Sequence, residues 1–161
     1  MTKKKERDYI DFAAFINIGL DRAMRHTRAA FVAGTLTGEG LSLQEWRSLL
    51  NLSRYGDCHL RELSRRAGLD ATHTSRAITE LEKRGYVRRY DDTEDSRRKR
   101  LCTTETGDDL VDRVWAQALG LDARIQQRLG KTRYRALVEA LDMIREMTIE
   151  DLQGDVAVAA E

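Results

Sequence analysis

The 161-residue chain contains no proline and only two cysteines, and both shortages exclude structural classes. The absence of proline suits long uninterrupted helices that are joined by glycines and capping residues. Cys58 and Cys102 cannot build a disulfide framework, and their separation does not match the spacing of a zinc finger. The chain also lacks an apolar run long enough to cross a membrane and a signal-type hydrophobic segment. We therefore expect a soluble cytoplasmic protein with no cofactor, no metal and no membrane partner.

Charge is abundant but nearly balanced, because 34% of the residues are charged while the net charge is only +1. Its distribution is uneven. From His59 to Arg100 there are 12 Lys or Arg against 8 Asp or Glu, whereas from Leu101 to Glu161 there are 7 against 12. This polarity indicates one basic working face on an otherwise acidic protein. The nearly neutral net charge does not suit a protein that coats nucleic acid nonspecifically, but it is compatible with a protein that binds a specific DNA site.

Hydrophobic spacing predicts a mainly α-helical chain with one small β-hairpin. A capping box from Ser42 to Glu45 opens one helix, and the Gly- and Thr-rich residues 34–40 before it are expected to form a loop. The other expected elements are helices at about 8–32, 59–67 and 71–84, strands at 86–90 and 100–103, and two helices after Thr104 with apolar residues three and four apart. The predicted order is α-α-α-α-β-β-α-α.

The stretch from His59 to Gly107 carries the strongest functional signal. It reads as a short helix, a turn at 68–70, a second helix that Asp70 caps and Gly85 stops, and a hairpin with the charged tip DDTEDSRRK. Such a segment is typical of proteins that lay one helix in the DNA major groove beside a flanking basic finger.

This pattern resembles the MarR family of winged helix-turn-helix transcriptional regulators. The matching features are GLDATHTSRAITELEKRGYV, the wing EDSRRKRL and the helix start TTETG, and LSLQEW upstream is similar to the second helix of the family. The resemblance covers residues 8–152. It implies a single MarR-like domain over 1–161, with a winged-helix DNA-binding part at 42–103 and dimerisation helices at 8–33 and 104–152.

The residues expected to contact DNA lie on the second helix of this motif and on the wing. Arg76 can bind guanine with two hydrogen bonds, and short polar neighbours on the same helix can reach base edges. The resemblance also matches Asp95 and Arg97 to the Asp-x-Arg of the family's wing, where the acid orients an arginine in the minor groove. The alternative for both sets is an ordinary solvated surface. The major-groove candidates are Thr72, His73, Ser75 and Arg76; the wing candidates are Asp95, Arg97, Arg98 and Lys99; weaker phosphate candidates are His59, Arg61, Arg65, Arg66 and Arg88.

One DNA-binding segment of this kind contacts only a short stretch of DNA, so two copies are needed for a site of useful length. A two-fold homodimer would place two reading helices about 34–36 Å apart and so predicts an inverted-repeat operator in double-stranded DNA. The first helix and the last two are free to form it, although their apolar seams could instead close within one chain.

Regulation is the least determined property. The resemblance implies a small-molecule effector, often an aromatic carboxylate or a related metabolite, for which we consider Arg22, Arg25, His26, Trp46 and Tyr55; ordinary core or surface roles are the alternative for each. Redox sensing by a cysteine is a second hypothesis, although an inert buried thiol is the commoner situation. Metal sensing has only the adjacent Cys58 and His59 as a starting point.

We therefore expect a dimeric, sequence-specific transcriptional regulator, a repressor that an effector such as an aromatic acid or thioester releases from its operator. A winged-helix protein-interaction module is the alternative from another class. We do not expect an enzyme, because no catalytic set of Ser, His and Asp, no phosphate loop and no paired inward carboxylates can be identified.

Overall fold

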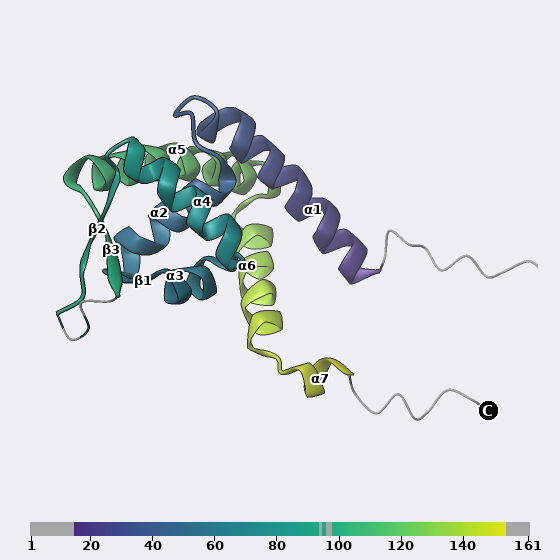
Figure 1. The fold of residues 1–161 in the computed structure, drawn as a ribbon. Coiled ribbons are helices and arrows are strands. Elements are labelled where there is room, and N and C mark those ends of the chain that lie inside the picture. Colours follow the sequence, from purple (N-terminus) through teal and green to yellow (C-terminus); the bar gives the residue numbers. More distant parts are fainter. Residues whose placement is uncertain (1–14, 94, 96–97, 154–161) are drawn as a thin grey trace, which may run out of the picture. The chain divides into compact units, whose positions relative to one another are not determined.

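The computed structural model describes residues 15–153 except 94, 96 and 97, and it has the mainly helical, winged architecture that the sequence predicts (Figure 1). Its residues form two compact units, one up to Ala118 and one from Leu119, with a single long helix running across the boundary. In chain order the elements are α1 (Ile16–Phe31), η1 (Val32–Leu36), α2 (Leu43–Tyr55), β1 (Cys58–His59), α3 (Leu60–Ala67), α4 (Ala71–Lys83), β2 (Val87–Asp91), β3 (Lys99–Thr103), α5 (Glu105–Leu129), α6 (Lys131–Glu146) and α7 (Ile149–Gln153).

The first helix differs from expectation at its C-terminal end. Helix α1 continues without a break into η1, one turn of π-helix that includes Gly34, so the loop begins at Thr37 and the prediction of a loop from Gly34 is wrong. The backbone N–H and the hydroxyl of Thr37 both donate to the carbonyl oxygen of Val32, each at 2.9 Å. These bonds hold the extra turn together despite its glycine and threonine content. The expected start near Asp8 lies outside the described residues.

Helix α2 begins as the capping box predicts. The backbone N–H of Glu45 donates to the Ser42 hydroxyl at 3.2 Å, and the backbone N–H of Ser42 donates to the Glu45 carboxylate at 2.6 Å. Both orphan N–H groups of the first turn are thus satisfied. The helix ends at Gly56, whose φ of 74° is in the region that favours glycine.

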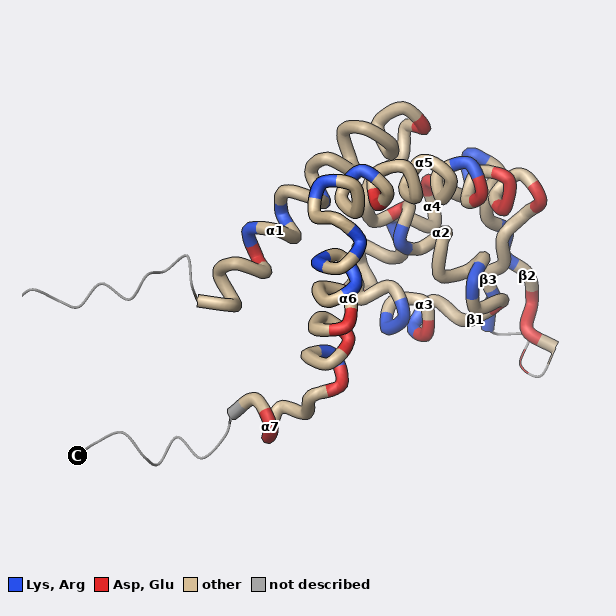
Figure 2. The backbone as a smooth tube through the Cα atoms, turned by 180° about the vertical axis from the view of Figure 1, so that it is seen from behind, with Lys and Arg blue, Asp and Glu red and all other residues tan. Residues whose placement is uncertain are grey.

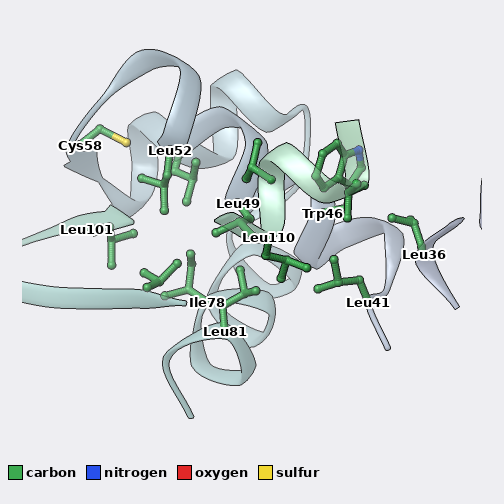
Figure 3. Close-up of a cluster of buried hydrophobic side chains, with 14 residues drawn as sticks. Leu36, Leu41, Trp46, Leu49, Leu52, Cys58, Ile78, Leu81, Leu101 and Leu110 are labelled. Carbon is green, nitrogen blue, oxygen red and sulfur yellow. The ribbon is translucent and has the colours of Figure 1, made fainter. Parts of the chain in front are cut away.

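The core of the first unit lies between α2, α4 and the start of α5. Ile78 and Leu81 from α4 face Leu49 and Leu52 from α2, and Leu110 from α5 lies between them (Figure 3). All five side chains are buried, so each helix is amphipathic towards the same centre. This packing fixes which face of α4 is left for solvent.

A three-stranded antiparallel sheet in the order β1-β3-β2 forms the wing and its base. Strands β2 and β3 pair from Val87 opposite Thr103 to Asp91 opposite Lys99, one residue away from the expected bounds. Strand β1 was not predicted, and it includes His59, which the sequence analysis expected at the start of the helix 59–67. Two residues are too few for an alternating pattern, so only the pairing with Leu101 and Arg100 identifies this strand.

The second unit contains the last part of α5 with α6 and α7. The Tyr134 hydroxyl donates to the Asp122 carboxylate at 2.7 Å and ties α6 to α5. No described residue of α6 is buried, although the helix carries the expected apolar series that includes Leu137 and Leu141. Helix α7 was not predicted, and residues from Gly154 onward lie outside the described part of the chain.

Candidate nucleic-acid interface

Helix α4 presents one buried and one exposed face, and the exposed face carries the major-groove candidates. Thr74, Ala77, Ile78 and Leu81 are buried. On the rest of the helix start, Thr72, His73 and Arg76 are exposed and Ser75 is half-buried. Because the buried face is fixed by the core, the structure brings these four candidates onto one end of one helix.

The start of α4 is held by Asp70, the residue that the sequence identifies as its N-cap. One carboxylate oxygen of Asp70 accepts the backbone N–H of His73 at 2.8 Å, and the other contacts Nδ1 of the same histidine at 2.5 Å. These hydrogen bonds lower the pKa of Asp70. The Thr74 hydroxyl donates to the Asp70 carbonyl at 2.8 Å. The His73 ring is therefore held against the cap, while Thr72 and Arg76 are exposed.

Arg76 also borders a groove of about 300 Å³ between α4 and the start of α2. Ser42 and Gln44 from α2 line its other side. The exposed end of α4 thus has polar groups from a second helix next to it.

A larger and more basic groove, of about 510 Å³, separates α3 from the wing. It contains several of the phosphate and wing candidates together, and Figure 2 shows Lys and Arg positions on α3 and on the strands that border it. Its lining is His59, Leu60, Arg61, Glu62, Arg65, Arg98 and Lys99. One carboxylate faces four side chains that carry permanent positive charge, so the groove suits an anion.

Glu62 balances part of this charge. Its carboxylate accepts hydrogen bonds from Arg65 at 2.7 Å and Arg66 at 2.8 Å, and these bonds lower the pKa of Glu62. Arg66 also lies over the Tyr55 ring, with its guanidinium carbon 5.8 Å from the ring centroid. Arg61 and Arg65 remain exposed towards the groove.

His59 lies at the junction of β1, α3 and the wing. Its Nδ1 is 3.1 Å from the Lys99 carbonyl oxygen, and its Nε2 is 3.1 Å from the Asp92 carboxylate. Arg100 reaches the same carboxylate at 3.5 Å and donates to the Asp57 carbonyl at 2.7 Å. Both ring nitrogens of His59 are engaged within the protein, so this side chain ties the wing to β1.

The wing candidates lie beyond this junction. The Arg98 guanidinium is 3.7 Å from the Asp95 carboxylate, and its backbone N–H donates to the Asp95 carbonyl at 2.8 Å. Lys99 pairs with Asp91 across the hairpin. Arg97, the expected minor-groove probe, lies outside the described residues, as does the expected Asp95–Arg97 pair. Arg88, a weaker candidate, stacks over the Tyr90 ring at 5.6 Å.

The residues considered for an effector are dispersed. Trp46 is buried in the core, with its ring centroid 6.0 Å from that of Phe31, while Tyr55 is exposed at the other end of α2. Arg25 pairs with Asp21 at 2.9 Å, and Arg22 and His26 are exposed on α1.

A different set of residues lines a groove of about 360 Å³ between α2 and α5. Its lining combines three apolar side chains, including exposed Trp115, with a serine, one cation and one carboxylate. The lining residues are Leu50, Ser53, Arg54, Val111, Asp112 and Trp115. Sequence reasoning missed them because α2 and α5 are more than fifty residues apart in the chain and nothing local indicates that they meet.

The cysteines and the metal-binding groups offer little for the alternative sensing mechanisms. Cys58 and Cys102 are both buried, and burial raises the pKa of each thiol, which disfavours the reactive thiolate. Within the described part of the chain, no three His, Cys, Asp or Glu side chains gather as a metal site would require. In the same residues, the structure contains no helix with the length and apolar character that crossing a bilayer demands.

Comparison with known proteins finds a family match for the central part of the chain. Residues 41–99, from just before α2 to the first residue of β3, match the MarR family. This segment of the chain therefore resembles the DNA-binding part of MarR-family transcriptional regulators. The match includes α3, α4 and β2, so it coincides with the segment that carries the exposed face of α4 and the lining of the basic groove.

Individual relatives extend the similarity beyond the matched segment. It is 26% identical over 144 residues to the HTH-type transcriptional regulator FarR of Neisseria gonorrhoeae, covering 89% of this chain and 90% of FarR. It is 26% identical over 99 residues to BilQ of Clostridioides difficile, covering 62% of this chain and 67% of BilQ. The crystal structure of NadR in complex with 4-hydroxyphenylacetate superposes with a TM-score of 0.65 at 25% identity, over 92% of this chain and all of NadR.

Proposed function

We propose that this protein is a homodimeric MarR-family repressor that binds an inverted-repeat operator and is released by a small aromatic acid. The observation that carries the proposal is the polar N-terminal end of α4. Thr72 and Arg76 are exposed there, while the opposite face of the helix is buried. A helix fixed on one face and polar on the other at its N-terminal end is the form in which such proteins enter a major groove.

The major-groove contact is assigned to Thr72, His73, Ser75 and Arg76, and the minor-groove contact to the wing around Asp95 and Arg97. Arg76 has the donor geometry to bind the O6 and N7 atoms of guanine. The backbone phosphates between these two contacts would lie against the basic groove, where Arg61 and Arg65 are exposed. This division gives specificity to α4 and affinity to α3 and the wing.

The effector is assigned to the groove between α2 and α5. Trp115 offers an aromatic surface, and Arg54 offers a cation for a carboxylate. NadR, a structural relative, was crystallised with the aromatic acid 4-hydroxyphenylacetate, which supports the ligand class. The dispersed α1 residues Arg22 and Arg25 are a weaker choice because neither lines this groove.

Selection from a random duplex library followed by fluorescence anisotropy tests the DNA-binding part of the proposal. We expect the selected sequence to contain an inverted repeat and its binding to fall steeply with salt. Arg76→Ala should weaken binding to that sequence by about 1–3 kcal/mol and relax the preference at one base position in each half-site. Lys83→Ala is the matched control, since Lys83 is exposed at the other end of α4 and pairs with Glu80.

Equal losses for Arg76→Ala on selected and random duplexes would remove its base-reading role. A selection that enriches no sequence would refute the regulator function assigned here. Release of bound DNA by 4-hydroxyphenylacetate or a related aromatic acid, abolished in Trp115→Ala, is the expected effector result, and release that Trp115→Ala leaves unchanged would place the effector elsewhere.

A further inference from the structure

Arg84, the first residue after α4, makes a set of contacts that DNA binding does not explain. One terminal nitrogen of its guanidinium donates to the Gly40 carbonyl at 2.8 Å, and the other donates to the Glu39 carbonyl at 2.9 Å. The first nitrogen is also 3.7 Å from the Glu45 carboxylate. The guanidinium carbon lies 5.0 Å from the centroid of the Tyr86 ring. A single side chain thus joins the end of α4 to the loop that precedes α2.

The loop that Arg84 binds is itself attached to α5. The Glu39 carboxylate is 3.7 Å from the Arg113 guanidinium and accepts a hydrogen bond from Gln117 at 3.3 Å. Glu39 therefore meets α5 through its side chain and α4 through its backbone carbonyl. One connection from α5 to α4 thus passes through Glu39 and Arg84.

The start of α5 holds the other side of the same helix end. The hydroxyls of Thr104 and Thr106 donate to the Gly85 carbonyl at 2.6 Å and 3.1 Å. The backbone N–H of Thr104 donates to the Tyr86 carbonyl at 3.1 Å. The C-terminal end of α4 is consequently fixed on two sides, by α5 directly and by the Glu39–Gly40 loop through Arg84.

From this geometry we infer that Arg84 is a positioning residue that sets the angle at which α4 presents its reading end. Thr72 lies twelve residues before Arg84, about 18 Å along the helix at a rise of about 1.5 Å per residue. A tilt of about 5° at the Arg84 end therefore displaces Thr72 by roughly 1.5 Å over that length. Base recognition requires placement within about 0.5 Å, so such a tilt removes specific contacts.

The inference rests on the proposed DNA-binding function, and it makes a distinctive prediction. Both terminal nitrogens of the Arg84 guanidinium donate hydrogen bonds to protein carbonyls, so we assign no phosphate contact to this side chain. Its loss should weaken specific binding without lowering the dependence of affinity on salt. Loss of an arginine that binds a phosphate would instead reduce the slope of log K against log salt by about 0.9 for each protomer bound.

The test compares Arg84→Gln, Arg84→Lys and the control Lys83→Gln on the duplex selected with the wild-type protein and on a scrambled duplex. Lys83→Gln removes the same charge one residue away, from a side chain that pairs only with Glu80 among the described contacts. For Arg84→Gln we expect about a tenfold loss on the selected duplex, little change on the scrambled one and an unchanged salt slope, since one lost base contact is worth about that factor. Lys83→Gln should leave the selectivity intact.

Arg84→Lys keeps the charge and part of the stacking on Tyr86 but cannot hold two carbonyls in the planar fork of arginine. It should lie between the wild type and Arg84→Gln in selectivity, and its thermal midpoint confirms that binding is measured on folded protein. Equal losses on both duplexes with a reduced slope, or unchanged selectivity in both Arg84 variants, would overturn the inference. Failure of the wild-type protein to select any sequence would refute the proposed function instead.

Discussion

Hydrogen bonds, as well as hydrophobic packing, determine the positions of several individual side chains in this protein. Asp70 and Ser42 cap their helices in the manner that residue type and spacing predict. Arg84 and His59, in contrast, meet partners more than thirty residues away, so their roles follow from the fold. Residue type alone suggested a phosphate contact for His59, whereas its two ring nitrogens bind the wing.

Ser48 gives a prediction about stability. Its side chain is completely buried in α2, and among the described residues its hydroxyl finds no hydrogen-bond partner. A buried hydroxyl without a partner costs about 1–3 kcal/mol relative to water. We expect Ser48→Ala to raise the free energy of unfolding by up to about 1 kcal/mol, because removing the oxygen also loses some packing. Urea denaturation measures the change, and a loss of stability would mean that the hydroxyl is satisfied after all.

At the scale of elements, the contact of residues 85–86, between α4 and β2, with the start of α5 explains why a Thr-x-x-Gly pattern opens α5. Thr104 accepts the backbone N–H of Gly107 at 3.1 Å while donating to the Gly85 carbonyl. Gly107 is buried directly against the backbone of Tyr86. The glycine is needed for space, since it lies inside a helix with ordinary backbone angles.

Gly107→Ala tests this close approach. A β-carbon at position 107 would lie 2.1 Å from the Tyr86 carbonyl oxygen, which is backbone and cannot rotate away. Despite the higher helix propensity of alanine, we expect the variant to lose about 1–3 kcal/mol of unfolding free energy through overpacking. Gly120→Ala is the control, because Gly120 is also in α5. A β-carbon there would have the flexible end of the Arg124 side chain as its nearest neighbour, at 3.7 Å. A Gly107→Ala protein as stable as the control would contradict the explanation.

At the scale of the whole molecule, the first unit and helix α6 differ in how much apolar surface they bury. The first unit has a continuous core from Leu36 to Val114. Helix α6 has no buried residue, and Leu137, Val138 and Leu141 remain more than 40% exposed. Apolar side chains that a single chain leaves uncovered at helical spacing favour the proposed two-fold partner.

Leu141→Glu should therefore shift the protein from dimer to monomer. Leu137 and Leu141 are four residues apart on one face of α6, so a carboxylate at 141 would be desolvated in an interface between copies. Glu139→Lys is the control, because it changes charge on the opposite side of α6. Sedimentation velocity over a range of concentrations measures the association. A dimer constant that Leu141→Glu leaves unchanged would exclude this face from the interface.

The sequence by itself determined the helices with strong periodicity, the caps at Ser42 and Asp70, the stop at Gly85 and the position of the wing. These features depend on interactions within about four residues, which local patterns record. The tertiary structure alone decided the strand β1, the π-turn after α1, the basic groove between α3 and the wing, and the contacts of Arg84. Apart from the π-turn, whose bonds join Thr37 to Val32, each depends on backbone groups or side chains that are distant in the chain. A cation on an exposed helix looks the same in sequence whether it meets solvent, a phosphate or a carbonyl forty residues away, and only the folded arrangement distinguishes the three.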